Sequence, residues 1–252
     1  MKLLIITRPF VFHGGVERAT AGLVGALVEH GHDVHLLSPR GQQAMPGVTQ
    51  HRLRLPPLPA AARALALAAG ARLVVARGVW DVVQSHERTL RQDVYRAGEG
   101  CHRAYLASVE DQPRARSVYH RVVLALERRV FTTTPAIVAI ARRGAAEIVE
   151  LYGVAPARLS VVYNGVDLAR FHPRNRARYR AAARAEAGIP ADAFTLLFIG
   201  NGFERKGLAT LIDALGALGE PNRRLLVIGK GDRRPFDARA ARRGVADRIV
   251  WL

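Results

Sequence analysis

A short apolar strand that leads through a glycine loop into a helix constrains the fold most, and its clearest copy begins at Thr195. Residues 195–199 (TLLFI) are β-branched, aromatic or aliphatic, which predicts a buried strand. Gly200 and Gly202 interrupt this run, and apolar residues then recur at helical spacing over 208–218. A strand followed at once by a helix is typical of a parallel α/β sheet.

Two cations stand between this strand and this helix. Arg205 and Lys206 are expected at the carboxyl end of the strand, where open α/β sheets bind their ligands. The helix start adds free N–H groups and partial positive charge, and the two side chains add full charges. This pattern predicts a site for an anion with several oxygens, such as a diphosphate. A basic helix cap on an exposed loop is the alternative.

The same succession recurs along the chain. Its first copy consists of a strand over 3–7, the glycine pair Gly14–Gly15, a helix over 17–29 and a strand over 33–38. The glycine pair lets the backbone approach a substrate, although such pairs are more often plain tight turns. It lacks the G-x-G-x-x-G spacing of dinucleotide-binding loops, so no nicotinamide cofactor is expected. Further strands are expected over 80–84, 136–140, 159–163, 224–228 and 249–252, and further helices over 60–77, 114–131, 142–152 and 236–244.

The alternation lapses in one arginine-rich, proline-flanked stretch. This predicts a first domain over 1–167, a linker over 168–192 and a second domain over 193–252. Gly229 ends a strand of the second domain, as Gly200 does, so both are expected at the same edge of its sheet.

The formal net charge is +17, which favours polyanionic partners such as nucleic acid, an anionic membrane face or a phosphorylated glycolipid. No nucleic-acid-binding module is recognisable, and the basic residues are spread along the chain. The helix over 114–131 is basic and amphipathic and can rest on a membrane, with an ordinary solvated helix as the default reading. The single cysteine, Cys101, excludes an internal disulfide and fits a reducing compartment. No apolar run approaches the roughly 18 residues of a spanning helix.

Ionisable residues gather after the strand over 80–84. His86 follows that strand directly, and Glu99 stands between two glycines, where little shields its carboxylate. Both are candidates to reach a substrate, Glu99 at a hydroxyl. An exposed turn carboxylate is the more common explanation for a residue such as Glu99.

Taken together, four stretches resemble the retaining glycosyltransferases of the GT-B fold, of the family 4 type. These are the loop Gly14-Gly15-Val16-Glu17-Arg18, the run 162–167 (VYNGVD) with Phe171 and Pro173 beyond it, the run 200–207, and the run 92–101 (QDVYRAGEGC). The last is similar to the subgroup that adds glucose to the lipopolysaccharide inner core.

The resemblance implies an α/β GT-B fold, in which two Rossmann-like doubly wound domains face a cleft. The first domain would bind the acceptor and the second the nucleotide sugar. Arg205 and Lys206 would then neutralise the donor diphosphate, on which charge develops in the transition state. Gly14 and Gly15 would approach the sugar and phosphate, and Gly200 and Gly229 would line the donor site.

The resemblance also implies roles for the two ionisable candidates. Glu99 would orient or deprotonate the acceptor hydroxyl, and His86 stands where related enzymes have a cleft histidine. No enzyme nucleophile is assigned. No metal is expected, because arginine and lysine carry the phosphate charge.

The function expected on this basis is transfer of a hexose, most readily glucose from UDP-glucose, to a lipopolysaccharide core heptose with retention of configuration. The enzyme is expected to be cytoplasmic and peripheral on the inner face of the membrane, without a nucleic-acid partner. The alternatives are another hexosyl donor, an exopolysaccharide lipid intermediate as acceptor, or a non-catalytic basic module that docks on anionic glycolipid.

Two departures from the family pattern qualify this expectation. Ala141 replaces a serine that usually follows the strand over 136–140, which weakens a local capping role. The chain also ends at Leu252, before the acidic motif of two glutamates that contacts the donor in the family. We therefore expect the second domain to be truncated and the chain as given to have little transferase activity.

Overall fold

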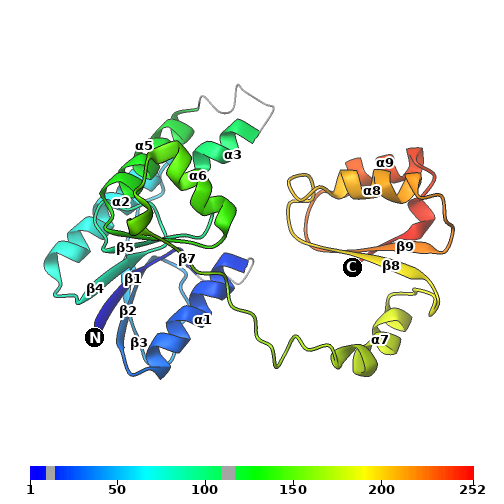
Figure 1. Ribbon diagram of the computed structural model, residues 1–252, viewed down its shortest axis with the longest axis horizontal. Helices are drawn as coiled ribbons and strands as arrows, with labels where there is room; N and C mark the ends of the chain where they lie inside the picture. Colours follow the sequence, from blue (N-terminus) through cyan, green and yellow to red (C-terminus); the bar gives the residue numbers. More distant parts are fainter. Residues whose placement is uncertain (10–14, 109–116) are drawn as a thin grey trace. The chain divides into compact units, whose positions relative to one another are not determined.

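Two parallel sheets, one in each of two units, organise the chain (Figure 1). The computed structural model describes residues 1–9, 15–108 and 117–252. Contacts between residues divide the chain into Met1–Gly165, which we call unit 1, and Val166–Leu252, which we call unit 2. The α/β class predicted from the sequence is therefore confirmed.

Unit 1 contains a seven-stranded sheet in the order β3-β2-β1-β4-β5-β6-β7, and every neighbouring pair is parallel. Its strands are β1 (Lys2–Ile6), β2 (Asp33–Pro39), β3 (Val48–Leu53), β4 (Val82–Ser85), β5 (Val94–Ala97), β6 (Ala136–Ala139) and β7 (Leu159–Val161). The chain builds outwards from β1 to β3, returns, and continues on the other side with β4. The order thus reverses between β1 and β4, and in such sheets ligands bind beyond the carboxyl ends of the strands at this point.

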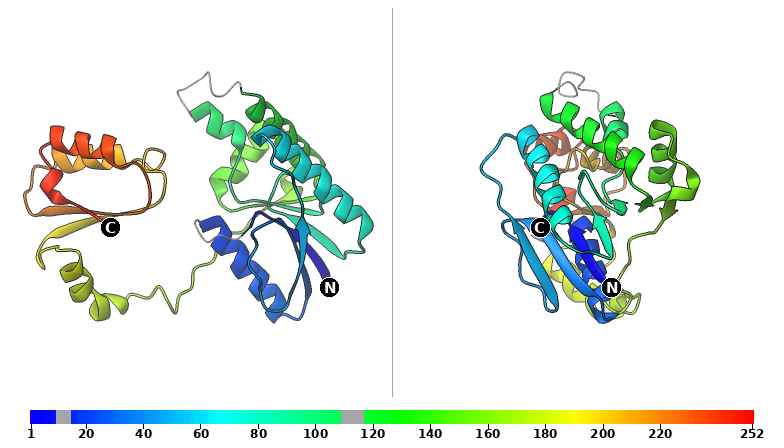
Figure 2. Two further views of the ribbon diagram at one scale, coloured as in Figure 1. Left: turned by 180° about the vertical axis from the view of Figure 1, so that it is seen from behind. Right: turned by 90° about the vertical axis from the view of Figure 1, so that its left-hand side faces the viewer.

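Helices cover both faces of the unit 1 sheet. Successive side chains of a strand point to opposite faces, and in β1 they are apolar on both, so both faces need a cover. They are α1 (Gly15–Glu29), α2 (Ala60–Arg77), α3 (His102–Ser108), α5 (Val118–Thr133) and α6 (Arg142–Tyr152). Ile5 of β1 packs with Val24 of α1, whereas its neighbour Leu4 packs with Val75 of α2. Accordingly α1 lies on one side of the sheet, and α2, α5 and α6 lie on the other (Figures 1 and 2).

The segment between β4 and α5 contains more structure than its composition indicates. β5 is a strand of only four residues, in which Tyr95 and Ala97 are buried and Arg96 points to the opposite face. Sequence analysis missed it because the run is short and interrupted by a charge. The helix expected over 114–131 is α5, which begins at Val118. Its N-cap is Ser117, whose side chain accepts a hydrogen bond from the backbone N–H of His120. Residues 114–116 lie outside the described residues.

Unit 2 contains a three-stranded parallel sheet in the order β10-β9-β8. Its elements are α7 (Asn175–Glu186), β8 (Phe194–Ile199), α8 (Leu208–Ala217), β9 (Arg223–Ile228), α9 (Arg234–Arg242) and β10 (Ile249–Trp251). One core joins the sheet to α8 and α9 and includes Ile212, Leu225 and Val227. On the other face, Leu226 and Val250 pack against a cluster of Ala187, Ile189 and Ala193.

The predicted linker over 168–192 contains a helix that belongs to unit 2. The division falls between Gly165 and Val166, and α7 occupies the middle of the expected linker. Arg184 of α7 donates from Nη1 to Thr195 Oγ1 at 3.0 Å and from Nη2 to the carbonyl of Ala193 at 2.6 Å. The alanine- and arginine-rich composition hid this helix, because it has few large apolar residues to mark a buried face.

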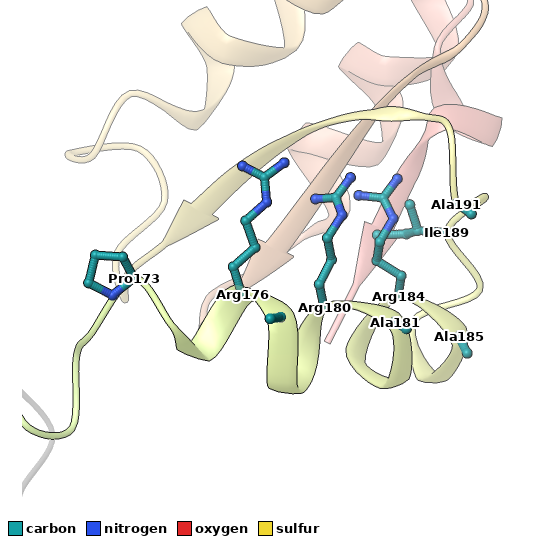
Figure 3. Close-up of a pocket in the computed structure, with 9 residues that line it drawn as sticks. Pro173, Arg176, Arg180, Ala181, Arg184, Ala185, Ile189 and Ala191 are labelled. Carbon is teal, nitrogen blue, oxygen red and sulfur yellow. The ribbon is translucent and has the colours of Figure 1, made fainter.

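Three arginines project in the same direction from α7, four residues apart, into a cavity of 700 Å³ (Figure 3). The Arg176 and Arg180 side chains make no hydrogen bond or ion pair within the described part of the chain, whereas Arg184 joins α7 to β8. None of the site residues predicted from the sequence lines this cavity.

Across the described residues, no helix is both long and apolar enough to span a membrane.

Replacement of Arg184 by alanine should detach α7 from unit 2, because it removes the hydrogen bonds to Pro190, Ala193 and Thr195. Net values near 1 kcal/mol for each of the three bonds predict a loss of about 3 kcal/mol in the local opening free energy. Hydrogen exchange of the α7 amides measures this quantity. Arg180→Ala on the same helix is the matched control and should change protection little. Equal effects of the two variants would contradict the role of Arg184 in holding α7 against β8.

Candidate functional site

Five charged side chains form a continuous series of ion pairs at the carboxyl edge of the unit 1 sheet. We call them the acid–arginine chain, and in order they are Glu87, Arg8, Glu99, Arg88 and Glu127. Arg8 lies 2.8 Å from Glu87 (Nε to Oε1) and 2.8 Å from Glu99 (Nη1 to Oε1). Arg88 lies 3.6 Å from Glu99 (Nη1 to Oε2) and 2.8 Å from Glu127 (Nη2 to Oε2). The segments that follow the neighbouring strands β1, β4 and β5 supply the first four of these residues, and α5 supplies Glu127. The acid–arginine chain therefore lies where the sheet order reverses.

Glu99 is the exposed member at the centre of this series. It stands in a tight turn after β5, where Gly100 has φ of +72° and its N–H donates to the carbonyl of Ala97. Its side chain is 41% exposed, although two guanidinium groups contact its carboxylate. This arrangement fixes the carboxylate in place while leaving it open to a substrate hydroxyl. The predicted role of Glu99 on the acceptor hydroxyl stays a prediction.

Glu127 anchors the series from inside the protein. Its side chain is fully buried on α5, and it accepts from Arg88, from the backbone N–H groups of His102 and Arg103, and from Tyr152 Oη at 2.5 Å. The two N–H groups belong to the first turn of α3, so the carboxylate also caps that helix. A buried charge is tolerated in proteins only with this kind of complete partnering.

Both arginines of the series keep their charge. Burial acts to lower the pKa of Arg8, but the carboxylates of Glu87 and Glu99 outweigh it and raise the pKa above the ordinary arginine value. Burial likewise acts on Arg88, and the nearby Tyr95, Glu127 and Glu99 raise its pKa in the same way. The site therefore presents fixed positive charge on both sides of the Glu99 carboxylate.

His86 is buried and neutral. Burial, together with the charge of Arg96, lowers the pKa of His86 to about 3. Its Nδ1 lies 2.9 Å from Thr20 Oγ1 and its Nε2 lies 2.7 Å from Gln84 Nε2. The amide nitrogen of Gln84 donates to Nε2, so the ring proton sits on Nδ1 and donates to Thr20. With both nitrogens engaged, the ring is suited to hold β4 and α1 in place rather than to exchange protons with a substrate.

Arg96 extends this polar face of the sheet. It is 8% exposed, and its Nη2 donates to Asn164 Oδ1 in the irregular segment that ends unit 1. Its Nη1 is buried and has no partner among the residues that the structure describes. Burial lowers the pKa of Arg96. An arginine inside an otherwise apolar strand was the sequence signal for this contact.

The glycine pair of the first loop is only partly described. Gly14 lies outside the described residues. Gly15 begins α1, and a side chain at Gly15 would meet no atom within 4 Å. The backbone at Gly15 is therefore open on that side, as close approach of a ligand requires.

In unit 2, two glycine loops are joined at the carboxyl edge of the sheet. Gly229 has φ of +149°, and a Cβ there would lie 2.2 Å from the carbonyl oxygen of Gly200. Only glycine permits this approach. Asn201 Oδ1 accepts from the N–H of Lys230 at 2.8 Å, and the N–H of Gly200 donates to the carbonyl of Ile228 at 2.9 Å. Gly200 and Gly229 thus lie at the same edge of the sheet, as predicted, and their direct contact is a further observation.

The start of α8 lies beside these loops. Gly207 is its N-cap in a left-handed conformation, with φ of +79°, and no side chain caps the helix. Arg205 and Lys206 are exposed and make no hydrogen bond or ion pair through their side chains in the described part of the protein. Arg205 lines a cavity of 550 Å³ with Gly202 and Gly231, whereas the Lys206 stem lies beside Gly200. The free N–H groups of the helix start, the two cations and the closely packed glycine loops are together the components of an anion site.

The predicted site residues thus fall into two groups. Glu99 and His86 lie in unit 1 with Gly15, and Gly200, Arg205, Lys206 and Gly229 lie in unit 2. Sequence analysis did not identify Arg8 and Arg88, which contact Glu99, or Glu127, which holds Arg88. Each left a signal, since Arg8 and Arg88 directly follow strands and Glu127 falls beside Leu126 on the buried side of α5. Among residues 1–9, 15–108 and 117–252, no group of three or more His, Cys, Asp or Glu side chains is arranged to hold a metal ion.

Comparison with known proteins identifies similar chains. The family model described as Glycosyltransferase Family 4 matches residues 13–170. A D-inositol 3-phosphate glycosyltransferase of Xylanimonas cellulosilytica is 37% identical over 131 residues, which is 49% of this chain and 31% of that protein. The match therefore spans less than a third of this curated relative.

Two solved structures show how far the fold is shared. The structure of WaaG, a glycosyltransferase involved in lipopolysaccharide biosynthesis, aligns with a TM-score of 0.82 at 22% identity and covers 99% of this chain and 69% of WaaG. Anabaena Alr3699/HepE in complex with UDP-glucose aligns with a TM-score of 0.66 at 17% identity and covers 100% of this chain and 68% of HepE. At these identities the likeness concerns the fold, which is that of the GT-B glycosyltransferases.

Acid should destabilise unit 1 through His86. The folded state keeps the ring neutral down to a pKa of about 3, whereas the unfolded chain takes up a proton near the ordinary value of 6.5. Stability is therefore lost as the pH falls from 6.5 towards 3, and linkage predicts a free energy of unfolding about 2 kcal/mol lower at pH 5 than at pH 7. Denaturation of wild type and His86→Gln at several pH values measures this. The variant should lose this component of the pH dependence, and identical slopes would contradict the assignment.

Removal of the Glu127 charge should cost much more than removal of a surface charge. Glu127→Gln leaves Arg88 partly buried without its main counter-charge, and loss of one partner of a buried ion pair costs about 3 kcal/mol or more. Glu147→Gln is the control, because Glu147 pairs with an exposed Arg143 and should cost less than about 0.5 kcal/mol. Equilibrium unfolding of unit 1 distinguishes them. Similar losses in the two variants would show that Glu127 is not the anchor.

Proposed function

Because the chain belongs to Glycosyltransferase Family 4, we propose that it takes part in transferring a hexose, glucose in the first instance, from a UDP-sugar to a lipopolysaccharide core acceptor with retention of configuration. The observation that carries this proposal is in unit 2, where the Arg205 and Lys206 side chains have no partner among the described residues and stand before the start of α8, which no side chain caps.

The donor binds, in this proposal, at the carboxyl edge of the unit 2 sheet. Its leaving group is a nucleoside diphosphate, on which negative charge grows as the bond to the sugar breaks. Cations and helix N–H groups that are already in place stabilise that charge more than they stabilise the ground state, which lowers the barrier. The structure of HepE with UDP-glucose supports a UDP-sugar as donor for this fold.

The acceptor binds in unit 1, beside the acid–arginine chain. The Glu99 carboxylate, held by Arg8 and Arg88, orients the acceptor hydroxyl and takes up its proton as the new bond forms. His86 fixes the surrounding strand end as a neutral hydrogen-bonded group. We assign no enzyme nucleophile, so retention follows from attack on the face from which the leaving group departs.

Two acceptor classes are supported by separate observations. The run 92–101, which contains Glu99, resembles enzymes of the lipopolysaccharide core, and WaaG shares the fold. The curated relative is named for D-inositol 3-phosphate, and its identity of 37% makes an inositol phosphate the second candidate. Transfer assays with each acceptor separate them. An exopolysaccharide lipid intermediate remains a third option within the same reaction class.

A membrane surface is the proposed place of action. The net charge of +17 and the exposed Arg121, Arg128 and Arg129 of α5 suit an anionic lipid face on the cytoplasmic side. The same charges suit a non-catalytic module that docks on anionic glycolipid. Nucleotide-sugar binding is the property that this rival lacks.

Titration calorimetry with UDP-glucose, repeated with UDP and GDP-mannose, tests the proposal. UDP and UDP-glucose should bind saturably, and Arg205→Ala with Lys206→Ala should weaken binding by roughly a hundredfold, since two charge-assisted contacts of about 1.5 kcal/mol each are lost. Arg176→Ala with Arg180→Ala removes the same charge from unit 2 outside this site and is the control. Equal weakening by both double variants, or no binding by a folded chain, would refute the proposed donor site.

A further inference from the structure

A cavity of 940 Å³ lies within unit 1, beyond the ends of the strands β1 to β4. Arg8 follows β1, Arg40 follows β2, and Glu87 follows β4, while the segment after β3 and the start of α2 close the other side. Neither Glu99 nor His86 lines this cavity. Arg8 belongs to both places, because it lines the cavity and holds Glu99 at 2.8 Å.

The lining is strongly positive. Arg8, Arg40 and Arg63 contribute three guanidinium groups against one carboxylate, that of Glu87, which gives a net charge of +2. Arg8 already satisfies Glu87 at 2.8 Å. The Arg40 and Arg63 side chains are exposed and make no hydrogen bond or ion pair in the described ranges of the chain. Two unpaired forks that line one cavity are suited to bind the oxygens of a single anion.

The start of α2 adds to this charge. Pro59 is the N-cap and provides no side-chain hydrogen bond, and the first turn contains no acidic residue. Its free N–H groups and the helix dipole therefore favour an anion at the end that lines the cavity.

The remaining wall is apolar. Leu55, Pro57, Leu58 and Leu67 line it, with the half-exposed Tyr119 of α5. Such a wall contributes affinity only for a ligand with an apolar or ring-shaped portion, because burial of apolar surface is its source of binding energy.

We propose that this cavity binds a phosphomonoester carried by the sugar acceptor, and that Arg40 and Arg63 determine specificity for it. This inference rests on the proposed function. A phosphomonoester carries about −1.5 to −2 charges at neutral pH, which matches the +2 of the lining. Arg8 links the two places, so the hydroxyl to be glycosylated lies towards Glu99 and the phosphate towards Arg40 and Arg63.

The shared chemistry is a sugar phosphate, which is either part of a lipid or free in solution. Calorimetry of the full chain with three probes distinguishes these sources: octyl glucoside 6-phosphate, octyl glucoside and glucose 6-phosphate. The two phosphorylated probes should bind and the neutral octyl glucoside should bind at least tenfold more weakly. Tighter binding of the octyl phosphate assigns the wall to a lipid-linked acceptor, and equal binding of the two phosphates assigns the site to a soluble one.

Variants test the two arginines. Arg40→Gln and Arg63→Gln should each weaken the phosphorylated probes about tenfold. Both side chains are exposed and unpaired, so their replacement should leave stability unchanged. Arg72→Gln is the matched control, since Arg72 is exposed on the same helix α2 outside the cavity. Equal weakening by Arg72→Gln, equal binding of the neutral probe, or no binding of either phosphate would each overturn the inference.

The same samples separate this inference from the proposed function. UDP-glucose binding should be unaffected by Arg40→Gln and Arg63→Gln, because the proposed donor site lies in unit 2. If the phosphate probes fail while UDP-glucose binds, only the acceptor inference falls. If UDP-glucose fails while the phosphate probes bind, the donor assignment falls and unit 1 remains an anion-binding domain.

Discussion

The buried carboxylate of Glu127 is the group on which the charged carboxyl edge of unit 1 depends. A charge enclosed in protein is stable only when every lone pair is satisfied, and five donors from three segments converge on it. In meeting that demand the fold fixes the start of α3 and the direction of Arg88. Arg88 in turn fixes Glu99, and Glu99 fixes Arg8. An exposed turn carboxylate thereby acquires a defined position without being buried itself.

The carboxyl edge of the unit 2 sheet is held mainly by backbone contacts, where unit 1 uses a series of ion pairs. Its loops are held by backbone contacts and by Asn201, and the cations at its edge, Arg205 and Lys206, are left unpaired. The difference follows from the proposed ligands. A diphosphate brings its own charge and is best met by free N–H groups and cations. A neutral hydroxyl brings none, so unit 1 must supply a carboxylate and hold it in place with arginines.

The sequence predicts those parts of the fold in which local pattern and burial agree. The strand over 195–199, the loop at Gly200 and the helix from Leu208 follow from the spacing of apolar residues and glycines. β5 and α7 do not, because four residues containing Arg96 and a helix of alanines and arginines have no apolar period to detect. The partners of Glu99 come from positions 8 and 88, and only the sheet order, which places β5 and β1 on either side of β4, brings them together.

The many arginines of this chain indicate a ligand only after those that hold the fold together are set apart from those that do not. Arg158 donates to the carbonyls of Phe131, Thr132 and Thr134 at the end of α5, where its charge also suits the helix dipole. Arg184 joins α7 to β8 in the same way. Such forks serve the fold, and a lysine has too few fixed donors to replace them. Arginines whose side chains have no partner among the described residues are more informative, because no contact there accounts for their charge. Those that also line a cavity are the best candidates to bind an anion, and they include Arg40 and Arg63 of unit 1, Arg205 beside α8, and Arg176 and Arg180 of α7.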